Sequence, residues 1–186
     1  MSADTVQRFI ISVYAENHIG LAGRIMQIFT RRKINIDSLT TSESEIEGIY
    51  RFTIVIHVTK ENVTKIVNQI KKVVDVMVAF YFEEEDVVYQ EIALYKIKSS
   101  TLLGSNVEKV VRRNSARILY VDQEFTVIEK TGHKEETQEL FEKLKPFGIL
   151  EFVRSGRVAI ARPMPNLHSW LEEVGLTDKF LVHSKN

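Results

Sequence analysis

The residues best suited to bind a ligand are five residues, most of them polar or small, that link the first apolar segment to the first expected helix. They are Glu16, Asn17, His18, Ile19 and Gly20. Because the first N–H groups of a helix have no partner within it, a helix N-terminus attracts anions. Asn17 is a suitable N-cap, and Gly20 would let a ligand approach the backbone closely. The pattern therefore predicts an anion-binding turn, although such turns commonly only cap a helix.

The elements on either side of this turn follow from hydrophobic periodicity. Before it, apolar and more polar residues alternate as in a half-buried strand, at Phe9, Ile11, Val13 and Ala15. After it, apolar residues recur on one helical face, at Leu21, Ile25, Ile28 and Phe29. The basic residues 31–33 complement the dipole at the end of that helix, and a second strand follows at 34–39.

The next segments complete a βαββαβ order. Residues 49–58 alternate clearly as a strand, and Thr59 can cap a helix with apolar residues at helical spacing up to Val74. A fourth strand at 76–82 ends in the acidic run 83–86. We interpret this run as a solvated boundary between domains rather than a metal site.

The same order begins again from Gln90. We expect strands at 91–98, 116–122, 125–130 and 149–160, the last interrupted at Ser155 and Gly156, with helices around Leu103 to Val111 and at 133–148. The prediction is an α+β protein of two tandem ferredoxin-like βαββαβ domains, residues 1–85 and 86–165. Residues 166–186 would form a tail with a short helix at 169–176. Four arginines of the second domain are interpreted as solvated charges, Arg112, Arg113, Arg154 and Arg157.

Composition excludes several classes of function. The 186 residues include 25 basic and 25 acidic side chains, so the formal net charge is zero. The chain therefore lacks the excess of positive charge that favours binding to nucleic acid. No cysteine is present, which excludes disulfides and thiolate chemistry and fits a reducing compartment. The sequence shows neither a signal-peptide pattern nor a long apolar run, so we expect a cytoplasmic protein without a membrane span.

The sequence gives little support for a catalytic, metal-binding or RNA-binding function. There is no GxSxG, HExxH, Walker or GxGxxG pattern, so we expect no catalytic residues. The sequence has five histidines, His18, His57, His133, His168 and His183. They lie in different expected elements and lack the spacing of metal ligands, so we predict no metal site. RNA-binding RRM domains share the βαββαβ order, but the third strand, GIYRFTIVIHV, lacks their signature.

A single βαββαβ sandwich leaves one face of its sheet without helices. The strand at 49–58 has apolar residues on both faces. Pairing across a two-fold axis would bury the second face, so the sequence predicts a homodimer.

Five short motifs give a family resemblance. They are ENHIG at 16–20, NIDSL at 35–39, RFTI at 51–54, VDV at 74–76 and EIALYKI at 91–97. In this order and spacing they closely resemble the N-terminal ACT domain of the small, regulatory subunits of acetolactate synthase, also called acetohydroxyacid synthase. The second half, with TGHKEE and EFVRSGRVAI, resembles the C-terminal domain of that family more loosely. The resemblance covers residues 8–162, and the chain after Pro163 departs from the family.

The resemblance implies a non-catalytic chain that activates the acetolactate synthase catalytic (large) subunit and confers feedback inhibition by a branched-chain amino acid, typically valine. Thiamine diphosphate, Mg²⁺ and FAD would belong to that catalytic partner, and this chain would need no cofactor. The alternative is a stand-alone ACT-type amino-acid sensor that regulates another enzyme or a transcription factor. A metal-responsive or RNA-binding module is a more distant alternative.

In the family the effector lies between two ACT domains of a dimer. Carried onto this sequence, Asn17 and Gly20 of one chain and Asn35 of the other would surround it. The N–H groups from His18 to Leu21 would hold its carboxylate, while Ile19 and Ile36 would form the apolar part of the pocket.

Overall fold

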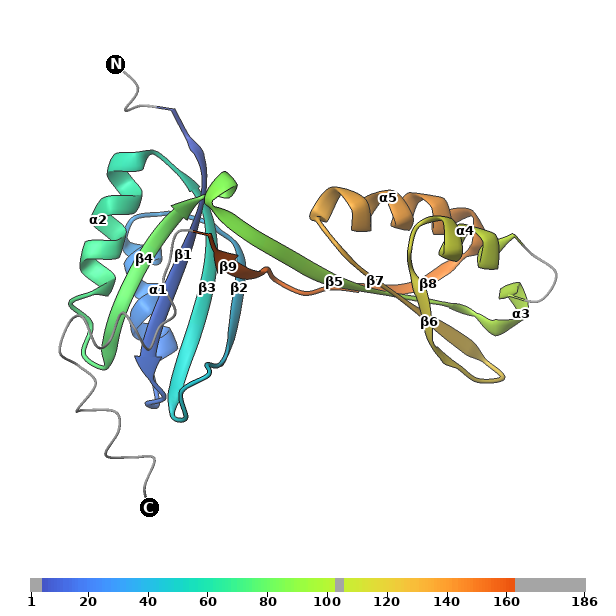
Figure 1. Ribbon diagram of the computed structural model, residues 1–186, viewed down its shortest axis with the longest axis horizontal. Helices are drawn as coiled ribbons and strands as arrows, with labels where there is room; N and C mark the ends of the chain where they lie inside the picture. Colours follow the sequence, from blue (N-terminus) through green and yellow to red (C-terminus); the bar gives the residue numbers. More distant parts are fainter. Residues whose placement is uncertain (1–4, 103–105, 163–186) are drawn as a thin grey trace. The chain divides into compact units, whose positions relative to one another are not determined.

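The chain divides into two compact units. The computed structural model describes residues 5–102 and 106–162 (Figure 1). The first unit runs to Val88 and takes in Ile160 to Arg162, and the second is Tyr89–Ala159. Each unit has its helices on an antiparallel sheet, so the predicted α+β fold is confirmed.

The first unit has the predicted βαββαβ order. Its elements are β1 (Gln7–Glu16), α1 (Leu21–Arg31), β2 (Ile36–Glu43), β3 (Ile49–Val58), α2 (Lys60–Ile70) and β4 (Val76–Glu83). The strand order in the sheet is β2-β3-β1-β4, with every neighbouring pair antiparallel. This order places β1 at the centre and leaves β2 at one edge.

Apolar side chains of α1 and α2 pack on one face of this sheet (Figure 1). Ile25 and Phe29 of α1 and Ile66 of α2 are essentially inaccessible to solvent. Thr59 caps α2 as predicted, since its side chain accepts a hydrogen bond of 3.3 Å from the Asn62 N–H. The core therefore fixes α1, and with it the turn that precedes it.

The opposite face of the first sheet differs from expectation. Its central side chains, Ile10, Ser12, Tyr14 and Val55, are at most 5% exposed. The prediction of an uncovered face is therefore wrong at the centre of the sheet. Because this face is buried within one chain, a second chain is not needed to cover the centre of the sheet.

The second unit repeats the topology of the first. After the short 3-10 turn η1 (Glu84–Asp86) of the first unit, strand β5 (Val87–Lys98) leads into the second unit. The elements that follow are α3 (Ser99–Leu102), α4 (Val107–Arg113), β6 (Arg117–Val121), β7 (Phe125–Gly132), α5 (Lys134–Leu144), the 3-10 turn η2 (Lys145–Phe147), β8 (Ile149–Arg154) and β9 (Val158–Ala161), and β9 ends in the first unit. The strand order β6-β7-β5-β8 matches that of the first sheet, and β9 also pairs with β5. The tandem repeat predicted from sequence is thus structural.

Several boundaries differ from the sequence-based prediction. Strand β5 begins at Val87 rather than at residue 91. Strand β2 begins at Ile36 rather than at residue 34, because Lys33 has a left-handed backbone (φ 55°) and the Ile34 N–H still bonds to Phe29 at the end of α1. The expected third helix is divided into α3 and α4. Leu103 and the helix expected at 169–176 lie outside the described residues.

Arg157 is the main correction among the charged residues. Its side chain is only 3% exposed, and its Nε lies 3.3 Å from Oε1 of the equally buried Glu91. The guanidinium also stacks 3.8 Å from the centroid of the Tyr89 ring. Arg154 lies 3.5 Å from the other oxygen of Glu91, whereas Arg112 and Arg113 are exposed as predicted. Burial of Arg157 is tolerated here because the Glu91 carboxylate pairs with its guanidinium and the Tyr89 ring lies against it.

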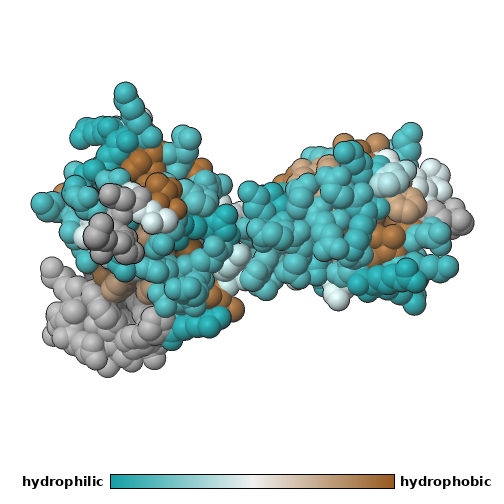
Figure 2. All heavy atoms as spheres, turned by 90° about the horizontal axis from the view of Figure 1, so that it is seen from above, coloured by the Kyte–Doolittle hydropathy of each residue, from teal (hydrophilic) through white to brown (hydrophobic). Residues whose placement is uncertain are grey.

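The face of the molecule seen in Figure 2 is mainly hydrophilic, with separate apolar patches. None of the helices in the described ranges has the length and apolar character needed to cross a bilayer.

Candidate functional site

The turn between β1 and α1 is more open than the sequence predicted. The N-cap of α1 is Gly20, which has a left-handed backbone (φ 83°), and no side chain caps the helix. The prediction of Asn17 as the N-cap is wrong, because its N–H bonds to the Gly48 carbonyl at 3.2 Å and keeps Asn17 at the end of the sheet. A helix capped only by glycine leaves its first N–H groups exposed.

The hydrogen bonds of the turn decide which N–H groups are free. The His18 N–H bonds to the Glu16 carbonyl at 2.9 Å, and the Leu21 N–H bonds to the His18 carbonyl at 3.2 Å. These two N–H groups therefore already have acceptors within the chain. The side chain of Leu21 is in the core, at 2% exposure.

The free N–H groups lie on four other residues. Within the described chain, no partner accepts from the N–H groups of Ile19, Gly20, Ala22 and Gly23. No atom lies within 4 Å of a Cβ built on Gly20 or Gly23, so a ligand can approach the backbone at both. Sequence reasoning missed Gly23, although a glycine in the first turn of a helix is a signal for close approach. The turn can thus bind an anion such as a carboxylate.

The predicted side chains near this turn are exposed. Asn17, His18 and Ile19 are all accessible, and the Ile19 side chain has no covering atoms. An apolar side chain held in solvent beside free N–H groups can contact an aliphatic ligand or a second chain.

A cluster of charged groups borders the turn, and sequence reasoning missed it. His18 Nδ1 lies 3.1 Å from Asp75 Oδ1 and 3.8 Å from Glu16 Oε2. Arg24 Nη2 lies 2.6 Å from Asp75 Oδ2, and this hydrogen bond holds the pKa of the Asp75 carboxyl below its usual range. One atom each from Glu16, His18 and Asp75 could ligate a metal ion, so His18 is not isolated as its sequence spacing suggested.

Asn35 and Ile36 lie at the opposite end of α1. The helix has 11 residues, which corresponds to a length of about 16 Å between its ends. Asn35 is exposed, whereas Ile36 is partly buried against the core and pairs with Ile56. Within one chain, Asn35 and Gly20 are therefore too far apart to contact the same small ligand.

The β2 edge could bring a second chain to these residues. Among the described residues, strand β2 pairs with β3 alone, so its other side offers N–H and C=O groups to another strand. Leu39 on this strand is 40% exposed. Exposed edges of this kind favour strand addition.

Comparison with known proteins gives the family. A family model described as the AHAS small subunit-like ACT domain matches residues 11–78, and one described as the small subunit of acetolactate synthase matches residues 90–163. The acetolactate synthase small subunit of Bacillus subtilis is 33% identical over 154 residues, which cover 82% of this chain and 90% of the relative. The chain belongs to the acetolactate synthase small-subunit family.

Two further members of this family are similar to the chain over most of their length. The small subunit of Mycolicibacterium smegmatis is 32% identical, over 82% of this chain and 89% of its own length. The crystal structure of the small subunit from Thermotoga maritima superposes with a TM-score of 0.76 at 26% identity, over 84% of this chain and 98% of that one. The resemblance predicted from sequence motifs is thus confirmed, together with the ACT domain.

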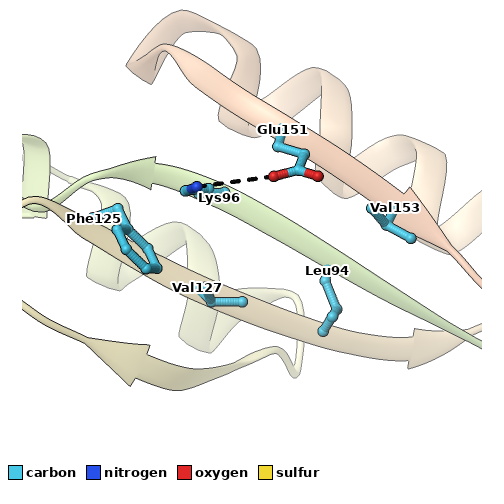
Figure 3. Close-up of a pocket in the computed structure, with 6 residues that line it drawn as sticks. All are labelled: Leu94, Lys96, Phe125, Val127, Glu151 and Val153. Carbon is cyan, nitrogen blue, oxygen red and sulfur yellow. Dashed lines mark ion pairs between the residues drawn. The ribbon is translucent and has the colours of Figure 1, made fainter.

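The region matched by the C-terminal small-subunit family model contains a concave surface. It is a hollow of about 250 Å³ on the open face of the second sheet (Figure 3). Six residues line it, namely Leu94, Lys96, Phe125, Val127, Glu151 and Val153. Lys96 Nζ lies 3.9 Å from Glu151 and 4.4 Å from the Phe125 ring centroid. Because the two charges compensate each other, this hollow lacks the anion preference of the α1 turn.

Proposed function

We propose that this chain is a non-catalytic regulatory subunit that activates the catalytic subunit of acetolactate synthase. In this proposal it also confers feedback inhibition by a branched-chain amino acid, with valine as the first candidate. The effector binds where two ACT domains of a homodimer meet, and the pathway concerned is branched-chain amino acid biosynthesis in the cytoplasm. Family membership supports the partner.

The main support for the effector site comes from four N–H groups at the start of α1 that have no acceptor among the described residues. They belong to Ile19, Gly20, Ala22 and Gly23. Their N–H groups can hold the effector carboxylate, and the exposed Ile19 can contact its aliphatic side chain. Asn35 of the second chain supplies a polar group that the first chain does not bring near.

The energetics favour a shared site. The end of a helix stabilises an exposed anion by about 0.3 to 1 kcal/mol, whereas binding with a Kd of 1 mM requires about 4 kcal/mol. Burial of the aliphatic group adds about 25 cal/mol per Å² of apolar area removed from water. A second chain provides such burial, and it links effector binding to dimer geometry. Inhibition then needs a differential affinity of about 1 to 3 kcal/mol between two states of the assembly.

The test is an activity assay with the catalytic subunit from the same organism. Its acetolactate synthase activity is measured with and without this chain, and each sample is titrated with valine, leucine and isoleucine. Activation together with new sensitivity to one amino acid supports the proposal and identifies the effector. No change in either would refute the assigned partner and favour a stand-alone amino-acid sensor.

Two variants test the site itself. Gly20→Asp places a negative charge and a side chain at the free N–H groups, and Asn35→Ala removes the polar group of the second chain. Both should abolish or greatly weaken inhibition. Gly148→Asp is the matched control for the first, since Gly148 also has a positive φ (80°) and no atoms near its Cβ position. Asn68→Ala, at an exposed position of α2, is the control for the second. Unchanged inhibition in both site variants would show that the effector binds elsewhere.

A further inference from the structure

We propose that Asp75 is a positioning residue that holds the effector turn in its binding geometry, an inference that rests on the proposed effector site. Asp75 lies between α2 and β4, more than 50 residues from the turn in sequence. It contacts the chain both before and after the turn.

Three contacts define this arrangement. The Asp75 carbonyl accepts a hydrogen bond of 3.0 Å from the Glu16 N–H at the end of β1. Its carboxylate oxygens lie 3.1 Å from His18 Nδ1 and 2.6 Å from Arg24 Nη2. One residue therefore links the last residue of the strand, the turn and the first turn of the helix.

The ends of the turn are held by the bond from the Asn17 N–H to Gly48 and by Leu21 in the core, but few side-chain contacts hold the residues between them. Ile19 makes no packing contact that excludes solvent, and no atom lies within 4 Å of a Cβ built on Gly20. Four N–H groups can bind a single carboxylate only when they converge on it, so small rotations of the turn weaken binding. The contacts of Asp75 limit these rotations.

The charges around Asp75 agree with this role. Arg24 lies in the first turn of α1, where a cation is unfavourable beside the positive end of the helix dipole. The carboxylate of Asp75 neutralises Arg24 and prevents it from moving into the anion site. Asp75 is 19% exposed at its side chain, and the Arg24 hydrogen bond lowers its carboxyl pKa, so the carboxylate stays ionised at neutral pH.

The backbone of Asp75 allows a clean substitution. Its φ is 77°, a conformation that glycine adopts freely and asparagine tolerates. Asp75→Gly therefore removes the carboxylate without adding backbone strain. Asp75→Asn keeps one acceptor oxygen. Ser115→Gly is the matched control, because Ser115 also has a positive φ (50°) but lies in the second unit.

The first measurement is the binding of valine, leucine and isoleucine to the full chain by calorimetry. For the amino acid that binds the wild type, we expect the Kd to rise by about ten-fold in Asp75→Gly, within the range typical of coupling between sites. Asp75→Asn should give a smaller rise, and Ser115→Gly should give none. Wild-type affinity in Asp75→Gly would overturn the proposal.

A second measurement does not need an effector. In NMR spectra of the ligand-free protein, Asp75→Gly should shift the His18 ring signals and increase the fast motion of the Ile19 and Gly20 amides, while Ser115→Gly should change neither. If the wild type binds no branched-chain amino acid, the proposed function fails, and this spectrum still tests the role of Asp75. An unchanged turn in Asp75→Gly would overturn that role.

Discussion

A mixed dimer of two inactive chains is the sharpest test of a site shared between protomers. Gly20 and Asn35 lie at opposite ends of α1, separated by about 16 Å of helix. A single valine cannot span that distance. If both residues contact one effector, they must come from different chains.

The expected stoichiometry follows from two-fold symmetry. In a dimer of one Gly20→Asp chain and one Asn35→Ala chain, one site receives both altered residues and the other receives neither. The mixed dimer should thus bind about half as much valine per chain as the wild type, with wild-type affinity. Each parent homodimer should bind almost none, since every one of its sites has one altered residue.

The assay uses two affinity tags. The chains are co-expressed with different tags, the mixed dimer is purified over both resins, and valine binding is measured by calorimetry. A dimer of Gly148→Asp with Asn68→Ala serves as control and should bind the wild-type amount. A mixed dimer that binds no valine, although it is folded and the control binds, would refute a shared site. A monomeric wild type would refute it as well.

Two further predictions concern the stability of the two units, one for each. Burial raises the pKa of Tyr95 to about 12, and its hydroxyl donates to the Thr137 carbonyl at 2.6 Å. The unfolded tyrosine loses its proton near pH 10, so the stabilising contribution is complete below about pH 10 and is lost as pH rises to about 12. Thermal unfolding across this window should show the loss, and Tyr95→Phe should remove it; an equal loss in Tyr95→Phe would contradict the assignment. Thr59→Ala should lower the free energy of unfolding by about 1 kcal/mol, because the Asn62 N–H loses its cap. Urea denaturation measures this change, with Thr59→Ser as control, and an unchanged midpoint for Thr59→Ala would contradict the cap.

The sequence predicted those parts of the fold that depend on local periodicity. The apolar spacing of α1 and the alternation of β3 gave the correct elements, since each pattern has one burial solution. The order of elements then determined the sheet topology in both units. The open character of Gly20 was likewise predicted from a local property, namely the absence of a side chain.

The parts that sequence missed depend on distant contacts. Asn17 is a good N-cap by type, but its N–H is taken by Gly48, 31 residues away in the chain. The pairing of Asp75 with His18 and Arg24 joins residues from separate elements, and local patterns contain no signal for it. The burial of Arg157, in the loop between β8 and β9, depends in the same way on Glu91 of β5.

The turn combines two properties that are usually in conflict. It has free N–H groups, which a ligand needs, yet such groups favour disorder when no local contact holds the chain. In this fold Asp75 and Gly48 contact the turn from distant parts of the chain, and the N–H groups of Ile19 and Gly20 have no acceptor among the described residues. A loop that is already held by contacts within its own chain loses less conformational entropy when the ligand binds. More of the binding free energy then remains to favour one dimer arrangement over another. In the proposed dimer Asn35 comes from the second chain, so that energy would act on the interface between chains. Under this proposal a small effector such as valine shifts the equilibrium of the whole assembly.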